Sequence, residues 1–156
     1  MAARRAPVRV SVPIAPRVER RVWSIASDVH AIEPIVETVQ SMCTAAGFSS
    51  SHCRLNIPVA ITEAISNAIL RGNANEQART VQVVIELEAQ CLTVEVSDEG
   101  AGFDMAQQQH APDDADWLDR EDGRGLFLMR SLMDAVESVQ PTAQRGHTMR
   151  LILHRA

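Results

Sequence analysis

The stretch RTVQVVIELEAQCLTVEVSDEG, residues 79–100, decides the fold of this chain. Apolar and polar residues alternate with a period of two in each half of it. The alternating apolar positions are Val81, Val83 and Ile85 in the first half, and Leu92, Val94 and Val96 in the second. Such alternation predicts half-buried β-strands. We therefore expect two neighbouring antiparallel strands at the centre of the domain.

The segments on either side of this pair predict helices and further strands. Residues 18–25 read as a strand, and a helix follows from a cap at Ser27 or Asp28 to a stop at Gly47. A second helix is predicted from Pro58 to Gly72, because proline suits the first helical position. After the strand pair we expect a helix over about 124–134 and closing strands within 135–141 and 147–155. This order predicts an α+β, two-layer sandwich with a mostly antiparallel sheet and helices on one face.

Length and composition limit the classes of function. The 156 residues suffice for one domain, which we place at 18–156 after a basic N-terminal tail at 1–17. A net charge of -5 and 3% aromatic residues argue against direct binding of nucleic acid. We find no membrane span or signal-peptide core and expect a cytoplasmic protein. Cys43, Cys53 and Cys91 lack the spacing of a zinc site or a disulfide framework, so we expect ordinary thiols.

Residues that suit chemistry gather in three stretches, of which EAISNA, residues 63–68, is the first. Glu63 and Asn67 are four residues apart and project from one helix face, opposite a face of isoleucines and alanines. A carboxylate can accept a proton, and an amide oxygen one turn away can ligate a hard cation. The same pair is also compatible with an ordinary solvated helix face.

The second stretch is VSDEGAGFD, residues 96–104, where a strand ends in acidic residues and two glycines. Asp98 can accept a hydrogen bond from an exocyclic amine, and Gly100 and Gly102 allow a flat ligand to approach the backbone. A hydrogen bond to a charged acceptor contributes about 1.5–3 kcal/mol, enough to select one base edge over another. A tight turn uses the same residue types, so that alternative stays open.

The third stretch consists of Gly123, Arg124 and Gly125 directly before an apolar segment that starts at Leu126. Glycines leave room for phosphate oxygens, and the free amides at a helix start attract anions. The stretch therefore favours a phosphate site at the start of a helix, although a plain loop can also contain G-x-G. The apolar stripe that begins with Leu126 indicates a core face.

The order of these pieces is similar to that of a known superfamily. A helix with E-x-x-x-N, a strand ending in D-x-G-x-G, a variable loop and then G-x-G-L resemble the Bergerat nucleotide fold of the GHKL ATPases. Within it the chain resembles the bacterial anti-sigma-factor serine kinases of the RsbW type over about residues 18–155. The matching segments are ITEAISNAILRGN, VSDEGAGFD, GRGLFLMRSLMDAVE and GHTMRL.

The resemblance implies a role for each matched residue. Glu63 would be the catalytic base for an attacking serine hydroxyl, and Asn67 would hold the Mg²⁺ that bridges the phosphates. Asp98 would receive the adenine amine, helped by Thr148, in a pocket shaped by the two nearby glycines, Gly100 and Gly102. The phosphates would be bound along Gly123, Arg124, Gly125 and Leu126. Arg71, which stands where many relatives have a histidine, would bind nucleotide as well.

The resemblance also implies a function. It predicts an ATP-dependent serine/threonine protein kinase that acts as an anti-sigma factor and uses ATP or ADP with Mg²⁺, under a lid at about 105–122. The expected partners are a sigma factor, a STAS-type antagonist as substrate, and a second copy in a homodimer. Two alternatives remain: an interaction module that binds nucleotide without kinase activity, and the ATPase domain of a histidine kinase. The first would not need Glu63 as a base, and the second would need a phosphoacceptor histidine on a separate chain.

Overall fold

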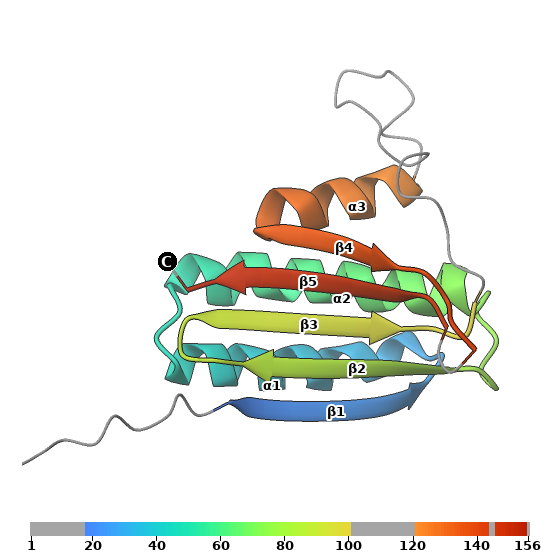
Figure 1. Ribbon diagram of the computed structural model, residues 1–156, viewed down its shortest axis with the longest axis horizontal. Coiled ribbons are helices and arrows are strands. Elements are labelled where there is room, and N and C mark those ends of the chain that lie inside the picture. The colour runs from blue at the N-terminus through green and yellow to red at the C-terminus, as the bar shows by residue number, and fades with distance from the viewer. Residues whose placement is uncertain (1–17, 101–120, 144–145, 156) are drawn as a thin grey trace, which may run out of the picture.

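The protein is a two-layer α+β sandwich, as the sequence predicts (Figure 1). The computed structural model describes residues 18–100, 121–143 and 146–155. Its strands are β1 (Glu19–Ala26), β2 (Thr80–Leu87), β3 (Cys91–Ser97), β4 (Ala135–Val139) and β5 (Thr148–His154). They form one antiparallel sheet in the order β1-β2-β3-β5-β4. The proposed tail at 1–17 lies outside the described residues, so that boundary stays a prediction.

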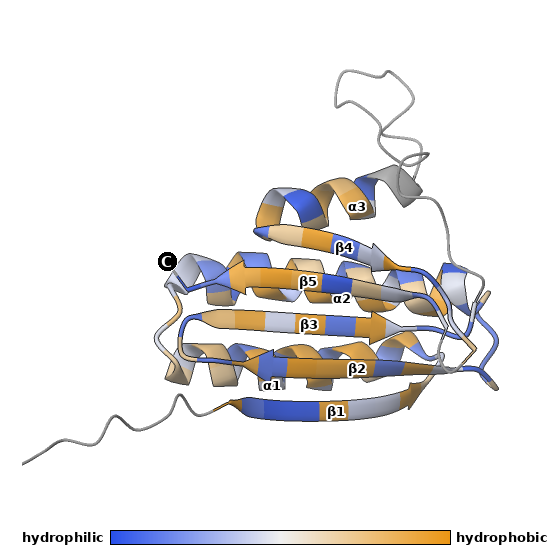
Figure 2. Cartoon of the chain, in the orientation of Figure 1, coloured by the Kyte–Doolittle hydropathy of each residue, from blue (hydrophilic) through white to orange (hydrophobic). Residues whose placement is uncertain are grey.

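The predicted strand pair forms the middle of the sheet. β2 and β3 are antiparallel neighbours, with Val83 opposite Val96 and Ile85 opposite Val94. These side chains are buried against the helices, whereas Glu95 on the alternate face pairs with Arg150 at 2.8 Å. Hydrogen bonding to Glu95 raises the pKa of that guanidinium. Figure 2 shows the same mixture of hydrophobic and hydrophilic positions along each central strand. One face of the sheet therefore belongs to the core and the other is polar.

The first helix has its predicted end, and the predicted cap belongs to a short turn in front of it. Asp28 caps a short 3₁₀ turn (Val29–Ala31), accepting a hydrogen bond from the His30 amide at 2.9 Å, and this bond lowers the pKa of the Asp28 carboxyl. α1 (Ile32–Ala45) follows directly. Gly47 has a φ of 82°, a conformation that few side chains adopt, and it ends the helix.

The second helix, α2, begins where Pro58 predicts, but another helical turn precedes it. A π-helical turn (His52–Asn56) leads into α2 (Ile57–Asn67), and a second one (Ala68–Gly72) follows it. Pro58 thus lies in the first turn of α2, as predicted, and the sequence analysis lacked only the helical turn that precedes it. The wide turn tolerates proline because the Cys53 carbonyl, the i→i+5 acceptor for residue 58, receives a hydrogen bond from Gln40 Nε2 at 2.9 Å.

The third helix begins before its predicted start. α3 spans Glu121–Leu132, so Gly123 and Gly125 lie within the helix and not in front of it. The prediction that these glycines precede the helix was therefore wrong, whereas their role in binding phosphate stays a prediction. Glycine inside a helix costs about 1 kcal/mol relative to alanine, and the packing of α3 beside α2 outweighs this local preference.

The core lies between the sheet and the helices. The predicted apolar face of α2 is confirmed, because its isoleucines are fully buried: Ile57, Ile61 and Ile65, together with Ile69 in the following turn. Burying each such side chain contributes about 1.5–3 kcal/mol. Leu126 and Met129 of α3 complete the core from the side of β4. Across the described ranges, no helix combines the length and the apolar character needed to cross a bilayer.

Candidate functional site

Two of the three predicted stretches meet where α3 crosses α2. Glu63 and Asn67 are half-buried on α2, and Gly125 of α3 lies directly against them. A Cβ added at Gly125 would lie 2.7 Å from Glu63 Oε2 and 3.3 Å from Asn67 Nδ2. Only glycine permits so close an approach without displacing the carboxylate. The fold therefore places a carboxylate and an amide against the backbone of the G-x-G stretch.

The remaining stretch, which contains Asp98 and Gly100, lies beside the C-terminal end of α2. Asp98 directly follows β3 and is 6% exposed. Its Oδ1 accepts a hydrogen bond from the Gly100 amide at 2.8 Å. A Cβ on Gly72 would overlap the Asp98 carboxylate, so the turn after α2 passes directly over this side chain. Asp98 and Gly100 are thus held against the helical segment that carries Glu63 and Asn67.

Asn73 holds this junction together, and the sequence analysis missed it. Its side chain is fully buried, and Nδ2 donates to Ser27 Oγ at 3.0 Å and to the Thr80 carbonyl at 2.9 Å. Its Oδ1 accepts from the Glu99 amide at 2.8 Å. One amide therefore connects the ends of three strands beside Asp98. The available signal was the turn-forming composition of RGNAN, residues 71–75.

Thr148 does not contact Asp98 through any interaction described here. It is the cross-strand partner of Ser97, and the two hydroxyl oxygens are 2.7 Å apart. Because successive side chains alternate between the faces of a sheet, Asp98 projects from the other face. There it meets His147, whose Nδ1 is 3.7 Å from Asp98 Oδ2. The role of Thr148 in base recognition stays a prediction, and His147 is a neighbour that the sequence analysis did not single out.

The other predicted site residues lie around this junction or outside the described part. Leu126 is 2% exposed and belongs to the core, which agrees with the core-face interpretation of its stripe. Arg124 on α3 and Arg71 after α2 are half-buried. Gly102 and the lid residues up to 120 fall outside the described residues. The nucleotide-binding roles of all these residues stay predictions.

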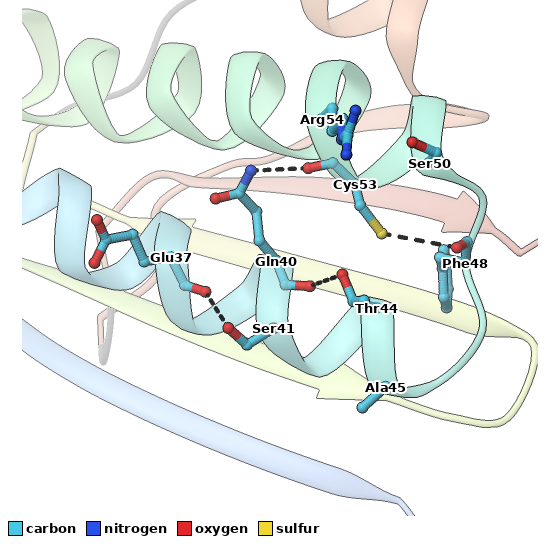
Figure 3. A pocket seen from close by; sticks show the side chains of 9 residues that line it. All are labelled: Glu37, Gln40, Ser41, Thr44, Ala45, Phe48, Ser50, Cys53 and Arg54. Carbon is cyan, nitrogen blue, oxygen red and sulfur yellow. Dashed lines mark hydrogen bonds between the residues drawn. The ribbon is translucent and has the colours of Figure 1, made fainter.

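A separate cavity of about 930 Å³ lies between α1 and the helical segment that precedes α2 (Figure 3). Its wall consists of Glu37, Gln40, Ser41, Thr44, Ala45, Phe48, Ser50, Cys53 and Arg54. None of the predicted site residues is among them. The buried thiols are close to this region, and burial raises the pKa of Cys43 to about 12, with a smaller contribution from Cys53. This cavity is therefore distinct from the junction of α2, α3 and β3.

Comparisons with known proteins match most of the chain. A family model described as a histidine kinase-like ATPase domain matches residues 25–153. The serine-protein kinase RsbW of Listeria innocua is 31% identical over 106 residues, which cover 64% of this chain and 66% of that protein. The anti-sigma F factor of Clostridium beijerinckii is 30% identical over 83 residues, covering 53% of this chain and 58% of that protein. The chain thus spans less than two thirds of the length of these relatives.

Proposed function

The chain belongs to the histidine kinase-like ATPase domain family, and on this premise we propose that it is an ATP-dependent serine/threonine protein kinase that acts as an anti-sigma factor. One observation carries the proposal: α3 approaches α2 so closely at Gly125 that the Glu63 carboxylate and the Asn67 amide lie against its backbone. The names of the similar proteins, serine-protein kinase and anti-sigma F factor, support it.

The residues at this junction fit a magnesium nucleotide. Mg²⁺ is commonly bound by one or two protein oxygens together with substrate phosphates, and the amide oxygen of Asn67 is a donor of that kind. The glycine at 125 keeps a space beside Glu63 and Asn67 that a Cβ would fill. When bound, ATP supplies the phosphoryl group, and Mg²⁺ neutralises charge that develops during its transfer. We assign Asn67 to the cation and the G-x-G stretch of α3 to the phosphates.

Glu63 is the residue that we assign to proton transfer. Its carboxylate accepts the proton of the attacking serine or threonine hydroxyl as that oxygen bonds to the γ-phosphorus of ATP and the bond from this phosphorus to ADP breaks. The contact with Gly125 limits where Oε2 can lie, which favours a single position for the base.

Asp98 provides the selectivity for adenine. Its Oδ1 is already engaged by the Gly100 amide, and Oδ2 retains acceptor capacity for the exocyclic amine of the base. Guanine has a carbonyl at that position, which would oppose a carboxylate. We therefore assign Asp98 to the adenine base. It lies beside Gly72, past the C-terminal end of α2.

The partners are part of the proposal as well. We assign a sigma factor as the protein that is inhibited and a STAS-type antagonist as the phosphorylated substrate, both met in the cytoplasm by a homodimer of this chain. The relatives named anti-sigma F factor support the first of these assignments. Phosphorylation adds about -1.5 to -2 charge units to the antagonist, which suits a switch between partners.

The decisive experiment measures phosphate transfer from labelled ATP to candidate STAS-type antagonists. We expect the wild-type chain to phosphorylate one of them. Glu63→Gln should bind ATP normally, but its rate of phosphate transfer should fall by a factor of about 10² or more. Thr62→Ala is the matched control, because Thr62 is an exposed neighbour on α2. Nucleotide and sigma-factor binding without any phosphate transfer would instead identify an interaction module, and transfer to a histidine would identify a histidine kinase component.

A further inference from the structure

The histidine beside Asp98 is buried in an unusual setting for an imidazole. His147 directly precedes β5 and is 2% exposed. Its Nε2 is 2.6 Å from the hydroxyl oxygen of Ser138 on β4, and its Nδ1 is 3.7 Å from Asp98 Oδ2 at the end of β3. A polar chain of three side chains therefore connects three neighbouring strands. Burying a polar ring is unfavourable unless its nitrogens have partners, so this arrangement differs from ordinary core packing.

We propose that His147 is a positioning residue for the nucleotide base: anchored by Ser138, it orients the Asp98 carboxylate toward the exocyclic amine of adenine. This inference rests on the proposed function, because it refines the base-binding part of that same site. It assigns to His147 and Ser138 a role in nucleotide choice, acting through Asp98.

The two oxygens of Asp98 are constrained in different ways. Oδ1 accepts the Gly100 amide at 2.8 Å, and the Asp98 amide donates to the His147 carbonyl at 2.9 Å, so one oxygen and the backbone are both tied. The 3.7 Å separation between Nδ1 and Oδ2 is longer than a hydrogen bond. The ring therefore limits the rotation of the carboxylate while Oδ2 keeps lone pairs for a ligand.

The Asp98 carboxylate and the Ser138 hydroxyl together are compatible with one tautomer of the His147 ring. A carboxylate favours an N–H facing it over a lone pair, which selects the tautomer with the proton on Nδ1. In that tautomer Nε2 is an acceptor and receives a hydrogen bond from the Ser138 hydroxyl. By donating to Nε2, Ser138 thus keeps the Nδ1–H of the imidazole facing Asp98. The loss of Ser138 or of His147 would leave the Asp98 carboxylate less constrained.

Two amide substitutions separate this role from simple packing. In His147→Asn the amide can occupy the place of Nδ1 and face Asp98, whereas in His147→Gln it can reach the place of Nε2 and Ser138. His147→Leu removes both nitrogens at similar volume. His154→Leu is the control, because His154 is the exposed histidine at the other end of β5.

The measurement is the ratio of the affinities for ADP and for purine riboside 5′-diphosphate, which lacks the exocyclic amine, by titration calorimetry with Mg²⁺. We expect the wild-type chain and His154→Leu to prefer ADP by about tenfold or more. His147→Asn should keep most of that preference. His147→Gln and His147→Leu should reduce it to about threefold or less, and Ser138→Ala should lie between these limits.

Three results would overturn the inference. If the variants His147→Gln and His147→Leu fold and keep the wild-type ratio, Asp98 needs no positioning by His147. If His147→Asn loses the preference as completely as His147→Leu, the ring acts by packing. In both cases ADP binding by the wild-type chain leaves the proposed function intact. If the folded wild-type chain binds no ADP, the proposed function and this inference fail together.

Discussion

Replacing Gly125 with alanine should separate stability from catalysis in this protein. The new Cβ would lie 2.7 Å from Glu63 Oε2, which is about 0.7 Å inside the distance at which ordinary carbon contacts begin. The nearest Asn67 atom, at 3.3 Å, is only slightly crowded. The carboxylate is the far end of a flexible side chain, so it can move aside by the required distance of about 0.7 Å. The main consequence is a displaced Glu63.

The effects on stability and on rate have opposite directions. Alanine is favoured over glycine inside a helix by about 0.8–1.0 kcal/mol, and the displacement of one carboxylate offsets part of that gain. We therefore expect a melting temperature that is unchanged or about 2–4 °C higher. A base that is misplaced by a large fraction of an ångström is expected to slow phosphate transfer by roughly 10- to 100-fold.

The assay combines thermal unfolding with the rate of phosphate transfer to the antagonist. Ser131→Ala is the matched control, because Ser131 is exposed on the same helix and the substitution raises helix propensity without approaching Glu63. An unchanged transfer rate in Gly125→Ala would show that the position of Glu63 does not matter and would refute its assignment as the base. A large fall in melting temperature would show that the backbone, and not the side chain, has to move.

Three further predictions concern the cation, the base and a buried thiol. Asn67→Ala should weaken ATP binding in the presence of Mg²⁺ but hardly change it in the presence of a chelator, as measured by calorimetry; equal losses in both conditions would exclude Asn67 as the ligand of the cation. The wild-type chain should bind ADP and ATP much more tightly than GDP and GTP because of Asp98, and equal affinities would contradict that assignment. The pKa of Cys43 is raised from 9.0 to about 12 in the folded state, so the unfolded chain ionises first and stability should fall as the pH rises from 9 toward 12. The slope from this group is at most about 1.4 kcal/mol per pH unit, and urea unfolding of Cys43→Ala at pH 8 and pH 10.5 should show a smaller loss than the wild-type chain.

The parts of the fold that the sequence predicts well are those that depend on local periodicity. The alternation in β2 and β3 and the apolar face of α2 are properties of residues close together in the chain, and both are confirmed. The end of α1 at Gly47 is equally local, because a positive φ at a helix end favours glycine. Such signals require no knowledge of distant partners.

The errors have a common cause in contacts between distant segments. The helical turn that precedes Pro58 depends on Gln40 of α1, which satisfies the Cys53 carbonyl. Glycine propensity suggests that α3 should begin after Gly125, whereas its packing against Glu63 and Asn67 on α2 keeps both glycines within the helix. Local propensities amount to about 1 kcal/mol per residue, and tertiary packing readily exceeds them.

The sequence by itself determined the α+β class, the order of the elements and the residue types of the candidate site, because periodicity and turn chemistry are encoded over a few neighbouring residues. Only the tertiary structure decided which of those residues meet. The register of β5 against β3 pairs Thr148 with Ser97 and puts His147 beside Asp98. A shift of one residue would exchange these neighbours, since alternate side chains point to opposite faces of a sheet. Register depends on the sum of many cross-strand contacts, and no short segment of the chain contains that information.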